Sequence, residues 1–310
     1  ELNKELSLPE VFTCANLSEL ASQIQRQQRV MQAMIPVADR GQSLPLSFAQ
    51  QRLWLLDQLD GGEAYLMPAS LKLKGSLDKD ALSQALNDLL ARHEILRTSF
   101  KQESGEVFQC IASSLELTLI ETDLSNGGGS AHTLDQLVHE NATIPFDLTY
   151  APLLRVHLIK VSENEHRLLL VMHHIVSDEW SAQILIQELS QAYNDRKNGT
   201  SPGWPALQIQ YADYSLWQRD WLQGQQLERQ ISYWQKQLGE DHPVLELPLD
   251  FPRPAQQNFA GGRETFELPQ SLVKQVTEFC QQNGFTLFQL LLGVFQILLA
   301  RYSGQELIRV

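Results

Sequence analysis

The feature that most constrains this chain is a run of five apolar residues, 168–172, that ends in two histidines. Apolar side chains at every position are typical of a strand that is buried on both faces. His173 and His174 follow at the carboxyl end of this strand. Successive side chains of a strand point to opposite faces, so the two histidines should not share one cleft. We therefore predict that one histidine works in a site and that the other supports it.

A helix should begin directly after these histidines. Ser177 or Asp178 can cap it, and apolar residues at helical spacing follow between 184 and 189. The junction between a strand end and a helix start is where open α/β sheets usually bind ligands. The pattern alone leaves two other interpretations open. The histidines could be an ordinary hydrogen-bonded pair, or they could bind zinc, although opposed neighbours disfavour the converging ligands that zinc needs.

Similar spacing arguments predict the other elements. We expect strands at 69–74, 107–111, 115–120 and 154–161, the last of which should pair with the apolar strand, and a further strand that begins in 261–268. We expect helices that start at Ser47 and at Asp78, and helices at 134–142, 211–222, 227–238, 271–280 and 286–301.

The stretch from His173 to Glu179 resembles the HHxxxDG signature of condensation domains from nonribosomal peptide synthetases. Further stretches resemble other motifs of that family and occur in the family's order. They are residues 47–55, 92–100, 145–155, 211–218, 233–234, 247–248 and 252–254. Because they extend from about residue 44 to residue 310, chance does not explain the resemblance.

The resemblance implies an α/β protein with a two-lobed chloramphenicol-acetyltransferase-like fold, in which the second lobe is incomplete. Residues 44–222 would form the N-terminal lobe of the condensation domain, and residues 223–310 the start of its C-terminal lobe. Residues 1–25 resemble the C-terminal remnant of a peptidyl carrier domain, with a plain amphipathic helical lead-in as the alternative. Residues 26–43 are polar and lack a strong period, which predicts a linker.

The resemblance also implies roles for individual residues. His174 would take the proton of an acceptor amine, or would hydrogen-bond the amine and the tetrahedral intermediate. His173 would support it from the other face of the strand. Asp178 would form an organising salt bridge with an arginine of the second lobe. The remaining residues expected around the active site are Glu179, Trp180, Ser181, Arg52 and Arg97.

Two residues near this site need separate interpretation. Glu179 stands where the family motif has glycine, which permits positive φ, and it adds bulk and charge beside His174. We therefore predict that Glu179 lowers activity. A catalytic role is conceivable for His93. A histidine at a helix end more commonly pairs with a neighbour, here Glu94, or with a backbone carbonyl, and we expect that structural role.

The function implied is amide bond formation between a donor aminoacyl or peptidyl thioester and the amine of an acceptor aminoacyl thioester. No cofactor would be bound directly, because phosphopantetheine arms would arrive on upstream and downstream peptidyl carrier domains. An adjacent adenylation domain is a further expected partner. Two alternatives remain: an epimerisation domain, which shares the signature but fits residues 47–54 less well, and a non-catalytic fragment that docks carrier domains.

Composition narrows the function classes. A net charge of −13 and a pI near 5.0 argue against nucleic acid or an anionic membrane as the partner. Three widely spaced cysteines without a CxxC pair indicate neither a zinc site nor a disulfide framework. The longest apolar run, 287–300, is too short to span a bilayer. We interpret it as a core helix of a cytoplasmic protein.

Overall fold

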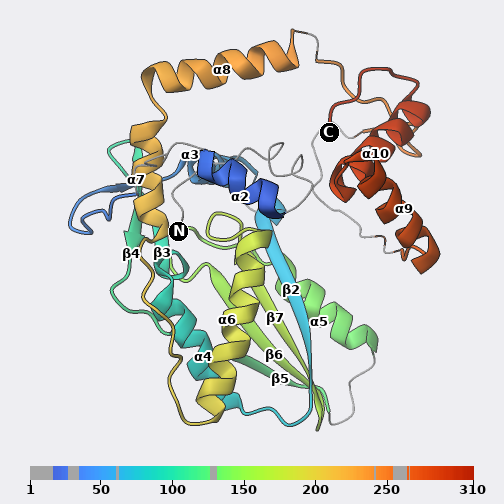
Figure 1. The fold of residues 1–310 in the computed structure, drawn as a ribbon. Coiled ribbons are helices and arrows are strands. Elements are labelled where there is room, and N and C mark those ends of the chain that lie inside the picture. Colours follow the sequence, from blue (N-terminus) through green and yellow to red (C-terminus); the bar gives the residue numbers. More distant parts are fainter. Residues whose placement is uncertain are drawn as a thin grey trace. The chain divides into compact units, whose positions relative to one another are not determined.

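The computed structural model describes residues 17–26, 35–60, 63–125, 131–240, 242–253, 264 and 266–310. These residues fall into two compact units (Figure 1). One unit runs from Ile35 to Glu228, and the other combines the residues before it with those from Arg229 onward.

The main sheet of the unit formed by residues 35–228 has four strands in the order β2-β7-β6-β5. The strand β7 is antiparallel to both of its neighbours, and β5 is parallel to β6. Their bounds are Leu66–Lys74 for β2, Ile120–Asp123 for β5, Leu154–Ser162 for β6 and Glu165–His173 for β7. The predicted apolar strand and its pairing with 154–161 are therefore confirmed. Residues 168–173 of β7 are all buried, because β7 lies in the interior of the sheet.

Two long helices, α4 (Lys79–Arg92) and α6 (Glu179–Lys197), contact each other and share one hydrophobic core with this sheet. The core takes Leu86 and Leu90 from α4, Leu189 from α6, and the even-numbered residues 168, 170 and 172 from β7. The helix α5 (Ala131–Thr143) contacts β2 and β7, and Figure 1 shows it on the other side of the sheet. The two faces of β7 therefore lie in different environments.

A smaller antiparallel sheet has the order β1-β4-β3, with bounds Leu44–Pro45, Glu106–Ile111 and Thr98–Glu103. The helix α3 (Phe48–Asp60) begins as expected from Ser47. Ser47 Oγ accepts from Gln50 N (3.1 Å), and Ser47 N donates to Gln50 Oε1 (3.0 Å). This reciprocal pair satisfies two N–H groups at the helix start. The remaining elements of this unit are the 3₁₀ helices η1 (Glu63–Tyr65) and η2 (Glu94–Arg97), and α7 (Tyr211–Trp221).

One predicted strand of this unit is wrong. Residues 115–119 have no regular secondary structure, and β5 begins only at Ile120. Leu117 is buried in the core, and its N–H donates to the side chain of Asn87 on α4 (2.9 Å). A side chain therefore replaces the strand partner that this segment would otherwise need.

The other unit contains α2 (Leu17–Arg26), α9 (Gln270–Asn283) and α10 (Leu287–Ser303), while α8 (Gly224–Leu238) spans the boundary between the units. The predicted helices at 227–238, 271–280 and 286–301 are confirmed. Of the strand predicted to begin in 261–268, residues 261–263 and 265 lie outside the described part, and the remaining residues are not in a strand.

The interpretation of residues 287–300 as a core helix is wrong for the described chain. All of α10 is described, and none of its residues is buried; Phe288, for example, is 72% exposed. The helix packs against α9, and that contact covers only part of its apolar surface. No single described helix is long and apolar enough to cross a membrane. The pair α9 and α10 passes that test only together and is bent by 106°.

Candidate active site

His173 lies on the closed side of the strand end. Its side chain is 0% exposed, and its Nδ1 accepts a hydrogen bond from Ile175 N (3.1 Å). In the neutral ring the proton therefore lies on Nε2, which is 3.4 Å from Asp57 Oδ1. Nε2 makes no hydrogen bond within the described part of the chain, so this contact is weak. Burial, aided by the nearby His174, lowers the pKa of His173 to about 4. Burial also raises the pKa of Asp57.

His174 lies on the open side. Its backbone N–H donates to Tyr65 O (2.8 Å), and its exposed side chain lines a pocket of about 450 Å³. The two histidines thus have opposite surroundings, as the strand period predicts. Much of the pocket lining is apolar and includes Leu53, Ile95, Ile184, Leu185, Leu207 and Ile209. Polar groups on the pocket surface come from His93, Ser177, Asp178, Ser181, Gln210 and Tyr211.

Asp178 is the N-cap of α6 and lines the same pocket. Its Oδ1 accepts from Ser181 N (2.7 Å) and from Ser181 Oγ (2.5 Å). These hydrogen bonds lower the pKa of Asp178, so the carboxylate is ionised at neutral pH. No ion pair joins Asp178 to another described residue, and the expected arginine partner stays a prediction. Its observed role is to hold the start of α6 beside His174.

Glu179 is the first residue of α6 and is exposed. Its conformation is helical, and Ser104 is the one non-glycine residue with positive φ in the described part of the chain. Glutamate therefore causes no backbone strain here, and a carboxylate in the first turn suits the helix dipole. The described residues that line the pocket do not include Glu179. Its neighbour Trp180 is 77% exposed and is likewise absent from the described lining.

The two predicted arginines lie apart from the pocket. Arg52 is exposed on α3, and no hydrogen bond or ion pair connects it with a described residue. Arg97 is half-buried at the end of η2, where it hydrogen-bonds Ala112 O and lies 3.8 Å from Glu94 Oε1. The structure therefore brings together His174, Asp178 and Ser181 around the pocket. It does not bring either arginine to that surface.

His93 is a pocket residue to which the sequence assigned the wrong partner. Its Nε2 lies 2.5 Å from Glu188 Oε2, and Arg92 Nε donates to the other oxygen of Glu188 (2.9 Å). His93 was expected to pair with Glu94 or with a backbone carbonyl; its Nε2 pairs with Glu188, and Glu94 binds Arg40. Glu188 lies on α6 three and four residues beyond Leu185 and Ile184, which line the pocket. Residues three and four apart lie on the same face of a helix, so this spacing could have indicated that Glu188 faces the pocket side of α6.

Two further residues missed from the sequence shape the pocket. Gln50 Nε2 donates to Ile175 O (3.3 Å), so side chains bind both backbone groups of the residue that follows His174. Tyr211 Oη hydrogen-bonds Ser47 Oγ (3.0 Å), and burial raises the pKa of this tyrosine.

Among the residues that the structure describes, no three His, Cys, Asp or Glu side chains gather as metal ligands do.

Comparison with known proteins assigns the family. A model of the condensation domain family matches residues 41–310. This chain belongs to the condensation domain family. It is 41% identical over 297 residues to a linear gramicidin synthase from Brevibacillus parabrevis, a match that covers 95% of this chain and 4% of that protein. It is 40% identical over 308 residues to a plipastatin synthase from Bacillus subtilis (strain 168), a match that covers 99% of this chain and 8% of that protein. The chain thus spans a small part of these relatives.

Solved structures agree with this condensation domain in fold. The X-domain from teicoplanin biosynthesis is 30% identical, with a TM-score of 0.75 over 87% of this chain and 59% of that one. The first condensation domain of the CDA synthetase is 20% identical, with a TM-score of 0.71 over 85% of this chain and 63% of that one, and shows the fold alone. The predicted α/β fold of the chloramphenicol-acetyltransferase type is confirmed.

Proposed function

We propose that this condensation domain forms an amide bond between a donor aminoacyl or peptidyl thioester and the amine of an acceptor aminoacyl thioester. Both substrates would be carried on phosphopantetheine arms of carrier domains, and the chain would bind no cofactor of its own. The observation that carries the proposal is the placement of His174. It is the one histidine of the His173–His174 pair that reaches the pocket.

The reaction needs an amine, a carbonyl and a place for one proton. The amine nitrogen attacks the thioester carbon, the C–N bond forms, and the C–S bond breaks as the tetrahedral intermediate collapses. The amine proton passes to His174, or is held in a hydrogen bond with it, and one proton finally resides on the departing thiol. An α-amino group has a pKa of about 7.7 to 8.0, so a useful fraction is neutral without help.

Positioning should contribute more than proton transfer. Orientation of two reactants is worth about 7 to 11 kcal/mol, whereas a general base typically supplies about 10²- to 10⁴-fold in rate. The apolar side chains in the pocket lining favour exclusion of water from the reacting centre. His173 contributes to positioning, because its neutral ring holds Ile175 N while Gln50 holds Ile175 O. The backbone that carries His174 is thereby fixed on its C-terminal side.

The partners proposed are an upstream and a downstream peptidyl carrier domain and an adjacent adenylation domain. Two observations support multidomain partners. The two synthases above are many times longer than this chain. A four-domain nonribosomal peptide synthetase, solved with AMP and glycine, matches 85% of this chain with a TM-score of 0.73. The cytoplasmic location expected from the sequence stays a prediction.

A docking function is the second candidate. The X-domain from teicoplanin biosynthesis was also solved in complex with OxyB, and that structure matches 88% of this chain with a TM-score of 0.74 and 30% identity. A domain of this fold can therefore serve as a binding surface for another protein. A non-catalytic domain of this kind would bind loaded carriers and release no product.

One experiment separates the two candidates. Donor and acceptor carrier proteins loaded with L-aminoacyl phosphopantetheine are incubated with the chain, and the condensed product is measured by mass spectrometry. Catalysis predicts product from the natural chain and a loss of about 10²-fold or more in His174→Ala. Carrier binding without product from the natural chain would favour docking and would contradict the proposed reaction.

A further inference from the structure

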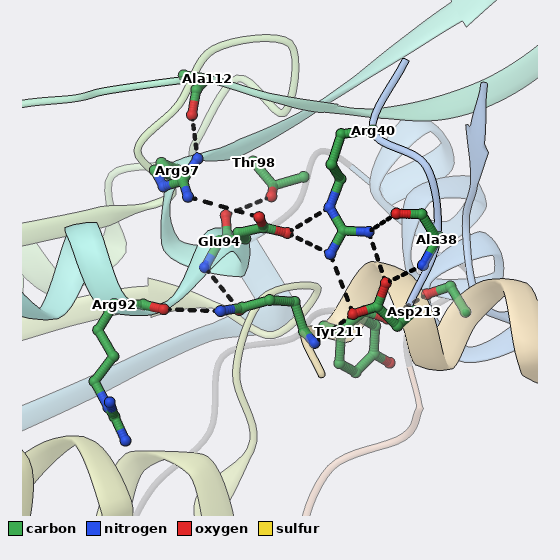
Figure 2. Close-up of polar contacts among 11 residues, drawn as sticks. Ala38, Arg40, Arg92, Glu94, Arg97, Thr98, Ala112, Tyr211 and Asp213 are labelled. Carbon is green, nitrogen blue, oxygen red and sulfur yellow. Dashed lines mark hydrogen bonds and ion pairs between the residues drawn. The ribbon is translucent and has the colours of Figure 1, made fainter. Parts of the chain in front are cut away.

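Arg40 precedes the part of the chain that matches the condensation domain family, which begins at residue 41. The sequence assigned it to a linker, yet it is bound inside the unit formed by residues 35–228 (Figure 2). Arg40 Nε donates to Glu94 Oε2 (2.9 Å). Its Nη1 and Nη2 donate to the two carboxylate oxygens of Asp213 (2.6 and 3.1 Å). Nη1 also donates to Ala38 O (2.9 Å).

Asp213 is the buried end of this network. Its side chain is 1% exposed, and it also accepts from Ala38 N (2.8 Å) and Gln210 N (2.6 Å). Burial acts to raise the pKa of Asp213, but the hydrogen bonds from Arg40 and from these two backbone groups outweigh it and lower the pKa. The carboxylate is therefore ionised, and Arg40 supplies its compensating charge. A buried charge that loses its partner is strongly unfavourable.

The network continues into the pocket wall through Gln210. The side chain of Gln210 accepts from Glu94 N (3.0 Å) and donates to Arg92 O (2.9 Å). Gln210 lines the pocket together with Tyr211 and Tyr214 from α7. On the η2 side, His93 and Ile95 flank Glu94 and line the same pocket. Arg40 therefore bonds to both segments that form this part of the wall.

We propose that Arg40 is a positioning residue. It fixes the start of α7 against η2, and thereby fixes the shape of the pocket that faces His174. The segment from Ala38 to Arg40 is then a working part of the catalytic unit rather than a tether. The kinetic part of this proposal rests on the proposed function, whereas the structural part can be tested without turnover.

Two variants and a matched control test the proposal. Arg40→Gln removes the charge, and Arg40→Lys keeps the charge but cannot span both carboxylates as a planar guanidinium does. Arg196→Gln is the control, because Arg196 pairs with both oxygens of Asp88 (2.7 and 2.6 Å) and joins α6 to α4. The two arginines are similarly exposed, at 30% for Arg40 and 25% for Arg196. Neither Arg196 nor Asp88 belongs to the described pocket lining.

The first measurement is hydrogen–deuterium exchange of backbone amides. In Arg40→Gln, exchange should accelerate at residues 93–97 and 210–214, and in Arg196→Gln those amides should exchange as in the natural chain. Arg40→Lys should lie between the natural chain and Arg40→Gln. If exchange at the two wall segments is unchanged in Arg40→Gln, or rises equally in Arg196→Gln, the proposal is overturned.

The second measurement is steady-state condensation with carriers loaded with L-alanyl, L-leucyl or L-phenylalanyl phosphopantetheine. A misplaced wall should raise the KM for the acceptor and lower kcat/KM by about tenfold to 10²-fold in Arg40→Gln, with partial recovery in Arg40→Lys. A purely stabilising residue would instead lower the active fraction and leave KM unchanged. If the natural chain forms no product, the proposed function fails, and the exchange experiment alone still decides the role of Arg40.

Discussion

His173 and His174 are adjacent and chemically identical, yet their surroundings differ completely. His173 is 0% exposed, is held neutral by burial, and has both ring nitrogens facing protein groups. His174 is exposed and faces a pocket of about 450 Å³. β7 ends at His173, and His174 is the first residue of the turn that follows; the two side chains still take opposite surroundings, as the alternation along a strand predicts. Position, rather than residue type, decides which histidine can meet a substrate.

Substitution of His174, the exposed histidine, should give the largest effect and tests this contrast most directly. His174→Ala should lower the condensation rate by about 10²- to 10⁴-fold, because the amine proton loses its acceptor or hydrogen-bond partner. His139→Ala is a matched control, since His139 is an exposed histidine on α5 outside the described pocket lining, and it should keep the natural rate. Both are measured by mass-spectrometric product formation. Equal rates for His174→Ala and the control would contradict the assignment of His174.

Substitution of His173, the buried histidine, should instead lower the stability of the fold. His173→Ala leaves a cavity and an unpaired Ile175 N–H, and we expect the free energy of unfolding to fall by about 2 to 4 kcal/mol. His174→Ala should stay within about 0.5 kcal/mol of the natural chain, as exposed substitutions usually do. Urea denaturation measures both. If His173→Ala unfolds with the same free energy as the natural chain, the buried ring of His173 contributes no more to stability than the exposed ring of His174.

The pH dependence of stability is a second test of the buried residue His173. The pKa of His173 is about 4 in the folded chain, well below the value of about 6.5 in an unfolded chain. Between these values the unfolded state binds more protons, so the contribution of His173 is complete above about pH 6.5 and is lost as pH falls toward 4. The loss should reach up to about 3 kcal/mol.

The control for this pH effect is His173→Gln, which keeps much of the volume and cannot titrate. Burial also lowers the pKa of His157 and His166, so the natural chain alone would not isolate His173. Urea denaturation at several pH values should give a flatter profile for His173→Gln than for the natural chain. Parallel profiles between pH 4 and 6.5 would show that His173 is not the titrating group.

The sequence predicted the local parts of the site well. The strand β7, the cap of α6 by Asp178 and the opposition of the two histidines all depend on residues within a dozen positions of one another. Short-range rules of strand period and helix capping are sufficient for such features. The same rules wrongly predicted a strand at 115–120 and a core helix at 287–300, because strand pairing and burial both depend on distant segments.

Long-range pairs could not be predicted from one sequence. Arg40 and Asp213 are 173 residues apart, and His93 and Glu188 are 95 residues apart. For His93, Glu94 was a plausible partner nearby in the sequence, and the structure pairs it elsewhere. Which charged groups meet is decided by the packing of α4, α6 and α7, and local propensity contains no information about that packing.

The weakest effect should come from the departure from the family motif at Glu179. The helical conformation of Glu179 and its position outside the described pocket lining argue against strain or direct obstruction. Glutamate still adds a negative charge at the start of α6, close to the reacting centre proposed here, and an exposed charge interaction is worth about 0 to 1 kcal/mol. Glu179→Gly and Glu179→Gln should therefore both condense faster, by up to about fivefold. If only Glu179→Gly is faster, bulk rather than charge is responsible, and three equal rates would show that the open side of β7 tolerates glutamate at this position.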